Sequence, residues 1–225
     1  MRSQPVILVH GLGSSFEHGW REPGWIDLLG DAGRKVIPID ILGHGTADAP
    51  HDPAAYADLE QSVAACLPDE PVDAIGFSLG AILLLTLASE RASRFGRLVV
   101  IGAGANVFRT DSHAELADAF EHGTQPENVT ARLFIGLAES AGNDPLAMAA
   151  VLRRPNEPLT AEQLGRVTCP TRVIIGDQDI AGPADPLVDA LPNAELVVLR
   201  GVDHFRAPSE FACIDAALDF IDAAP

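Results

Sequence analysis

The sequence has few basic residues, and this shortage narrows the classes of partner that the protein can have. Its 15 lysines and arginines stand against 32 aspartates and glutamates, which gives a formal net charge of −17 at pH 7. Nucleic-acid-binding domains usually carry a basic patch, and attraction to anionic lipid surfaces also depends on clustered basic residues. The charge balance therefore argues against nucleic acid and against the membrane surface as partners.

Long apolar runs and paired cysteines are also missing. No stretch approaches the roughly 18 consecutive apolar residues of a membrane helix. The first apolar stretch, 5–11, is short and continues into HGLG with no small-residue cleavage site, so it predicts a core strand rather than a signal peptide. Cys66, Cys169 and Cys213 lie far apart and show no CxxC or Cys/His spacing typical of metal or redox sites. We therefore expect a reduced, cytoplasmic protein, monomeric or homodimeric.

What the sequence does contain is a regular alternation of short apolar runs and helical patterns. At 225 residues it can form one domain with a substantial core. The predicted strands are 5–11, 35–45, 72–78, 96–103, 171–177 and 194–202, and the predicted helices between and after them are 25–33, 53–68, 79–90, 183–191 and 208–222. Continuous Val/Ile/Leu runs indicate strands covered on both faces. The expected fold class is α/β, with a doubly wound, mainly parallel sheet of about six strands.

One segment, at about 104–167, interrupts this alternation. It contains no convincing strand, and helical stretches are expected around 112–122, 126–141, 144–154 and 160–166. An insertion of this length is too large for a plain crossover between neighbouring strands. We interpret it as a helical lid over the carboxyl ends of the strands, where open α/β sheets bind ligands. The prediction is thus a single domain over 1–225 with one inserted lid.

Ser78 lies in GFSLG, where a predicted strand meets a predicted helix. Gly-x-Ser-x-Gly alone is a weak signal, but a strand-to-helix turn is the context in which the motif has a mechanism. Glycines two residues before and after the serine remove side chains that would clash in a sharp bend. Ser78 is therefore a candidate nucleophile, although a small polar residue in a tight turn is the simpler alternative.

A serine nucleophile needs a base, and the base needs an acid. His204 follows the last predicted strand, at the same sheet edge as Ser78. His10 and His44 also end strands, but each precedes a glycine turn, so we interpret both as structural imidazoles that bind loop backbone. His18 lies further along the loop after the first strand and is a candidate to face the site.

Three carboxylates near strand ends are candidates for the acid, and their positions alone do not distinguish them. Asp179 and Asp177 both stand in IIGDQDIAGP, and Asp203 directly precedes the candidate base. Solvation or loop capping is the simpler interpretation for each of them.

Five motifs in this order resemble the α/β-hydrolase family: HGLG, GHG, GFSLG, GDQD and VDHF. The resemblance spans essentially the whole chain outside the inserted segment. It implies a catalytic triad of Ser78, Asp179 and His204, and an oxyanion hole formed by the backbone N–H groups of Leu12 and Leu79. It also implies acyl-enzyme chemistry on Ser78 without a metal or any other cofactor.

Three features depart from the family's usual pattern. The sequence begins at the strand that resembles the family's third, so the usual N-terminal hairpin is missing. The segment resembling the oxyanion loop lacks the proline often found there. Asp203 stands where glycine commonly precedes the histidine, which places a second carboxylate near the imidazole and leaves Asp203 a competitor of Asp179.

The inserted segment offers few fixed charges to capture a charged substrate. We therefore expect an esterase-like serine hydrolase that cleaves a small to medium, mostly apolar carboxylic ester, with Gly11, Trp20, Phe108 and Phe134 as candidate substrate-binding residues. Thioesterase, lactonase and carbon–carbon bond hydrolase activities are alternatives with the same triad. A non-catalytic receptor on the same scaffold is the alternative from another class.

Overall fold

The protein is described by a computed structural model that covers residues 4–110 and 113–224. Its centre is a sheet of six strands, β1 (Val6–Val9), β2 (Val36–Ile39), β3 (Val72–Phe77), β4 (Phe95–Ile101), β5 (Thr171–Gln178) and β6 (Ala194–Asp203). The strands lie in the order β2-β1-β3-β4-β5-β6, and each neighbouring pair is parallel. The predicted parallel sheet of about six strands is confirmed.

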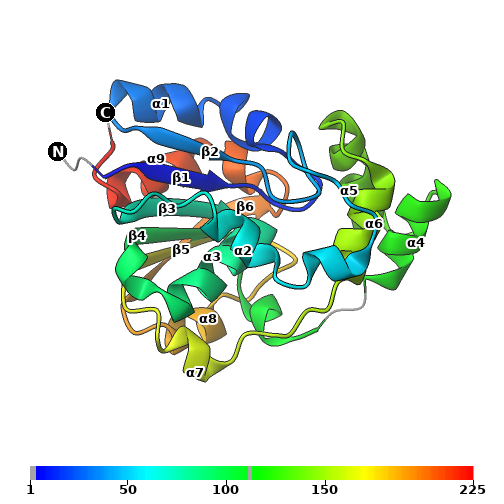
Figure 1. Ribbon diagram of the computed structural model, residues 1–225. Helices are drawn as coiled ribbons and strands as arrows, with labels where there is room; N and C mark the ends of the chain where they lie inside the picture. Colours follow the sequence, from blue (N-terminus) through cyan, green and yellow to red (C-terminus); the bar gives the residue numbers. More distant parts are fainter. Residues whose placement is uncertain (1–3, 111–112, 225) are drawn as a thin grey trace.

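Helices cover both faces of this sheet (Figure 1). One face packs against α1 (Trp25–Asp31) and α9 (Phe211–Phe220), and the other against α2 (Leu59–Ala64), α3 (Leu79–Glu90) and α8 (Asp185–Ala190). Side chains alternate between the faces along each strand. In β1, Val6 and Leu8 therefore belong to the core on one face, while Ile7 and Val9 belong to the core on the other.

Some helices are shorter or more broken than the sequence predicts. The predicted helix 53–68 consists of a 3-10 turn, Pro53–Tyr56, followed by α2, because Asp58 has a non-helical backbone with φ −114° and ψ 56°. The predicted helix 208–222 is likewise a 3-10 turn, Ala207–Ser209, and then α9. A π-helix and two further 3-10 turns are not predicted, and they span Glu17–Arg21, Ala92–Arg94 and Ala105–Phe108.

Four helices lie between β4 and β5, as the sequence predicts: α4 (Ala114–His122), α5 (Val129–Ser140), α6 (Pro145–Arg153) and α7 (Ala161–Leu164). The predicted start of the first one, at 112, lies outside the described residues. Figure 1 shows α4, α5 and α6 grouped beyond the carboxyl ends of the strands, whereas α7 packs against α3 and α8 on the sheet face. The first three helices, which we call the inserted helices, are thus the part of the segment that lies over the sheet edge.

None of the helices in the described ranges is both long enough and apolar enough to cross a membrane.

Candidate active site

Ser78 occupies a strained turn between β3 and α3. Its backbone has φ 53° and ψ −115°, in the left-handed half of conformational space that side chains disfavour. The neighbouring glycines are required by close contacts, because a Cβ on Gly76 would lie 2.8 Å from the Cα of Ala81, and one on Gly80 would lie 2.2 Å from the carbonyl oxygen of Val9. The turn therefore tolerates no side chains at these two positions and holds the Ser78 hydroxyl at the sheet edge.

His204 lies beside this hydroxyl, after β6. Its Nε2 is 3.0 Å from Ser78 Oγ, and its Nδ1 is 2.8 Å from Asp179 Oδ1. An ionised carboxylate can only accept hydrogen bonds, so Nδ1 carries the ring proton and Nε2 is free to accept the serine O–H. The imidazole ring is buried and packs against the ring of Phe77 at a centroid distance of 4.9 Å.

Only one of the three candidate acids contacts the histidine. Asp179 has a fully buried side chain, and its Oδ1 also accepts a hydrogen bond from the N–H of Ala181 at 2.8 Å. Asp177 is exposed and accepts the N–H of Gly201. Asp203 accepts the N–H groups of Phe205 and Arg206 at 3.0 Å, so it caps the following turn. The geometry thus links Asp179, and neither competitor, to His204.

A cavity of about 180 Å³ opens beside Ser78 and His204. Its lining includes three further residues that the sequence singles out, Leu12, Leu79 and Phe134. Leu79 is the first residue of α3, so its N–H has no acceptor within the helix. The structure therefore places both candidate oxyanion residues at the cavity that contains the candidate nucleophile.

The other candidate substrate-binding residues lie elsewhere. Gly11 and Trp20 line a second cavity, of about 380 Å³, whose described lining includes Phe77 but not Ser78. Trp20 is fully buried and packs edge-on against Trp25 at a centroid distance of 5.1 Å. Phe108 is partly buried against the main core. His18 also lines the larger cavity and pairs with Glu22, so it does not join the Ser78 cavity.

The loop that follows β1 is held by His10. Its Nδ1–H donates to the carbonyl of Gly11 at 2.8 Å, and its Nε2 accepts the N–H of Ile41 at 3.1 Å. The Ile41 amide can only donate, so the neutral Nδ1-protonated tautomer is the one that satisfies both contacts. Burial lowers the pKa of His10, which keeps this form neutral. The predicted structural role of this imidazole agrees with its contacts.

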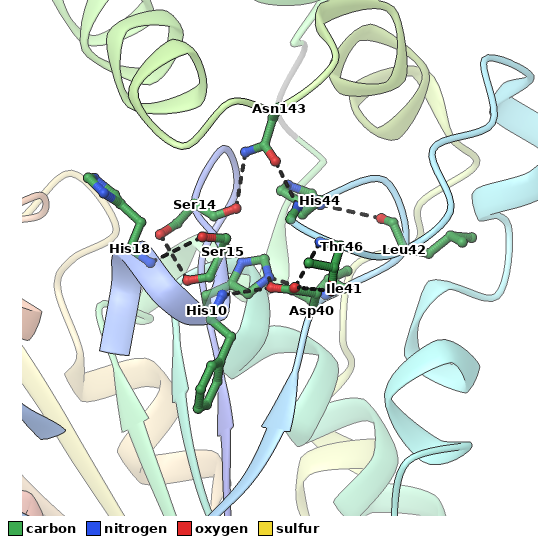
Figure 2. Close-up of polar contacts among 12 residues, drawn as sticks. His10, Ser14, Ser15, His18, Asp40, Ile41, Leu42, His44, Thr46 and Asn143 are labelled. Atoms are coloured by element: carbon green, nitrogen blue, oxygen red, sulfur yellow. Dashed lines mark hydrogen bonds and ion pairs between the residues drawn. The ribbon is translucent and has the colours of Figure 1, made fainter. Parts of the chain in front are cut away.

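Asp40 fixes the far end of the same loop. One carboxylate oxygen accepts the N–H of Phe16 at 2.7 Å, and the other accepts the N–H and O–H of Thr46, both at 2.9 Å. Burial opposes ionisation of Asp40, but these donors outweigh it and hold its pKa below the usual value. Figure 2 shows how Asp40 and His10 connect the two loops that follow β1 and β2, while His44 bonds to Leu42 within the second loop.

The free energy of unfolding is expected to depend on His44 between about pH 6.5 and about pH 3. Burial, reinforced by the nearby His10, lowers the pKa of His44 to about 3. Between these two pH values the unfolded chain binds a proton on His44 that the folded chain does not bind. Each pH unit of acidification therefore lowers the free energy of unfolding by about 1.4 kcal/mol through His44. Urea unfolding of wild type and His44→Gln across this range measures the difference in slope.

A matched control for that experiment is His122→Gln, because His122 is exposed on α4. His122→Gln should keep the wild-type slope of the unfolding free energy against pH. His44→Gln should lower this slope by about 1.4 kcal/mol per pH unit, the contribution of one bound proton. Equal slopes for wild type and His44→Gln would show that His44 is not held neutral by the fold.

Asn143, between α5 and α6, fastens the inserted helices to the body. Its Nδ2 donates to the carbonyls of Gly13 and Ser14 at 2.7 and 3.1 Å, and its Oδ1 accepts the N–H of Gly45 at 2.8 Å. Figure 2 shows this amide bridging the loop of Ser14 and the turn of His44. One side chain thus ties the insertion to the loop after β1, which contains the candidate oxyanion residue Leu12, and to the loop after β2.

Asn143→Ala is expected to lower the free energy of unfolding by about 1–3 kcal/mol, because three backbone groups lose a partly buried partner. The amide of Gly45 should exchange its hydrogen faster in the variant, as measured by hydrogen–deuterium exchange. Asn128→Ala is the control, since Asn128 only caps α5 by accepting the N–H of Ala131. Exchange at Gly45 that is the same in both variants would contradict this role of Asn143.

The cavity wall has a charged part that the sequence does not predict. We expected few fixed charges in the inserted segment, but Arg109 and Arg154 both line the Ser78 cavity, together with His113. None of the three stands in a motif, and their convergence depends on how the insertion folds over the sheet edge. A run of two arginines at 153–154, beside a helix end, is the only signal in the sequence that pointed to this position.

Metal ligands show no comparable grouping. In the ranges 4–110 and 113–224, no three His, Cys, Asp or Glu side chains are placed to hold a metal ion together.

Known proteins share this fold. Protein Rv2715 of Mycobacterium tuberculosis (strain ATCC 25618 / H37Rv) is 24% identical over 263 residues, covering 96% of this chain and 75% of Rv2715. BpoC from Mycobacterium tuberculosis H37Rv superposes with a TM-score of 0.76 at 18% identity, covering 99% of this chain and 93% of BpoC. The enol-lactonase from Burkholderia xenovorans LB400 superposes with a TM-score of 0.73 at 20% identity, covering 99% of this chain and 92% of the enol-lactonase. At these identities the two solved structures show a common fold.

The sequence also matches a profile of a known protein family. The profile described as "Alpha/beta hydrolase family" matches residues 6–212, which include every strand of the sheet, the strained turn at Ser78 and the loops that carry Asp179 and His204. The chain belongs to the alpha/beta hydrolase family.

Proposed function

We propose that the protein is a serine hydrolase that cleaves a small to medium, mostly apolar carboxylic ester through an acyl-enzyme on Ser78. The observation that carries this proposal is the continuous chain of contacts from Ser78 Oγ to His204 Nε2 and from His204 Nδ1 to Asp179 Oδ1, at 3.0 and 2.8 Å. A serine hydroxyl becomes an effective nucleophile when an oriented base takes its proton. These contacts supply His204 as the base and Asp179 as the acid that orients it.

The proposed reaction follows from these contacts. His204 takes the Ser78 proton as the hydroxyl oxygen attacks the ester carbonyl, and Asp179 stabilises the imidazolium that forms. The carbonyl oxygen becomes negative and accepts hydrogen bonds from the N–H groups of Leu12 and Leu79, each of which is worth about 3–4 kcal/mol of barrier. His204 then protonates the leaving alcohol, and in the second half it activates the water that releases the acyl group.

The cavity supports a substrate of limited size. Its volume of about 180 Å³ is below the roughly 300–1,000 Å³ of pockets that hold drug-sized ligands. Apolar side chains of Leu116, Phe134, Leu152 and Ile180 make up much of its wall. A short acyl chain with an apolar portion fits this lining better than a long lipid does.

A panel of p-nitrophenyl esters of increasing acyl length, with matched thioesters, tests the proposal. We expect turnover that is highest for short acyl groups and is abolished by pretreatment with a fluorophosphonate. Faster turnover of the thioesters would favour a thioesterase, and turnover limited to cyclic esters would favour a lactonase. Absence of turnover for every ester, with Ser78 still reactive toward the fluorophosphonate, would contradict the esterase proposal and favour carbon–carbon bond cleavage or a receptor role.

A further inference from the structure

The described residues that line the Ser78 cavity include arginines but no acidic side chain, in contrast to the acidic composition of the whole sequence. Aspartate and glutamate make up 32 of the 225 residues, yet neither occurs among the described residues that line this cavity. Arg109 and Arg154 line it, with His113 beside them and the amides of Asn106 and Asn156 as further hydrogen-bonding groups. In a protein of net charge −17, two arginines with no acidic side chain among the described lining residues make this cavity a favourable place for an anion.

Arg154 is the member of this set whose polar contacts the structure describes. It stands directly after the end of α6 and is half-buried. Among the described residues its guanidinium makes one hydrogen bond, from Nη1 to the carbonyl of Val151 at 2.7 Å, and no ion pair. Burial lowers its pKa, and Glu60 acts weakly in the opposite direction.

The adjacent arginine shows the usual alternative. Arg153 forms ion pairs with Asp118 and Glu121 of α4. A partly buried cation without a carboxylate partner is costly, because lost hydration is not replaced. Unlike Arg153, Arg154 has no carboxylate in direct contact among the described residues, and a bound anion would supply one.

We propose that the substrate carries a carboxylate at the end remote from its scissile ester, and that Arg154 binds this carboxylate in the Ser78 cavity. This inference rests on the proposed function and adds a charged group to the mostly apolar ester. Guanidinium groups match the planar geometry of carboxylates and make strong, charge-assisted hydrogen bonds to them. The ester carbonyl would lie at Ser78, and the short apolar chain between the two groups would contact Phe134 and Leu152.

Two esters test this inference, one with a free remote carboxylate and the other with that carboxyl group methylated. Mono-p-nitrophenyl adipate has a free carboxylate, and p-nitrophenyl methyl adipate is its neutral counterpart. We expect wild type to favour the anionic ester by about tenfold or more in kcat/KM, the size typical of a hydrogen bond to a charged group. Arg154→Gln should reduce this ratio to near unity, and Arg154→Lys should retain part of it. Arg153→Gln, the matched control, should keep the wild-type ratio.

Binding can be measured without turnover. Hexanoate should slow fluorophosphonate labelling of Ser78 more strongly than hexanamide does, and Arg154→Gln should remove this difference. Two results would overturn the inference while the proposed hydrolase stands. In the first, Ser78 is labelled but the wild type shows no preference for the anionic ester; in the second, the preference survives in Arg154→Gln. Failure of the fluorophosphonate to label Ser78 at all would instead contradict the proposed function. Thermal unfolding of each variant shows whether a lost preference comes from a lost fold.

Discussion

Ser78→Ala is expected to lower kcat for the best ester by about a millionfold, the size seen when a triad nucleophile is removed. The loss is large because the variant leaves no atom to form the acyl-enzyme, and His204 then has no hydroxyl proton to accept. Release of p-nitrophenol under saturating substrate measures the effect. KM is expected to change much less, since Ser78 contributes one small side chain to a cavity formed by many others.

A control variant separates this effect from general damage. Ser140→Ala removes a hydroxyl from an exposed residue at the end of α5 and should leave kcat near the wild-type value. If Ser78→Ala retained more than about a tenth of the wild-type kcat, the nucleophile would have to be another residue, because loss of a triad serine costs several orders of magnitude.

Asp179→Asn is expected to lower kcat by about 10⁴-fold, as in other triads where the acid is changed to its amide. An asparagine can present its N–H₂ group to His204 Nδ1, and this favours the tautomer that carries its proton on Nε2. Such an imidazole cannot accept the Ser78 proton. Steady-state kinetics at neutral pH measures the loss, and thermal unfolding checks that the buried amide is tolerated.

Asp177→Asn and Asp203→Asn are the matched controls for the acid. Each changes one carboxylate to an amide close to Asp179 in space or sequence, but neither side chain contacts His204. Both variants should keep kcat within about tenfold of wild type, since neither removes the partner of Nδ1. A loss in Asp177→Asn that exceeded the loss in Asp179→Asn would assign the acid to Asp177.

The sheet and the positions of Ser78, Asp179 and His204 could be predicted from the sequence, because buried parallel strands leave continuous apolar runs. Each of these three residues closely follows such a run, and parallel strands bring their carboxyl ends to one edge. The strained turn was also predictable, since Gly76 and Gly80 mark positions where neighbouring backbone leaves no room for a Cβ.

The interior of the site could not be predicted in the same way. Arg109 follows the 3-10 turn Ala105–Phe108 and Arg154 follows α6, and both line the Ser78 cavity as a result of how the segment between β4 and β5 folds, which no periodic pattern encodes. Asn143 is a single polar residue between two helices, and its three bonds go to backbone groups that are about 100 residues or more away along the chain. Backbone partners leave no signature in a sequence, so contacts of this kind emerge only from the fold.

The central claim, that Ser78 is a nucleophile activated by His204, is tested most directly by mapping the site of fluorophosphonate labelling with mass spectrometry. We predict a single adduct on the peptide that contains GFSLG, located at Ser78, in wild type. His204→Ala should abolish labelling on the same timescale, and Arg153→Gln should not affect it. An adduct on another serine, or labelling of Ser78 at an undiminished rate in His204→Ala, would contradict the account.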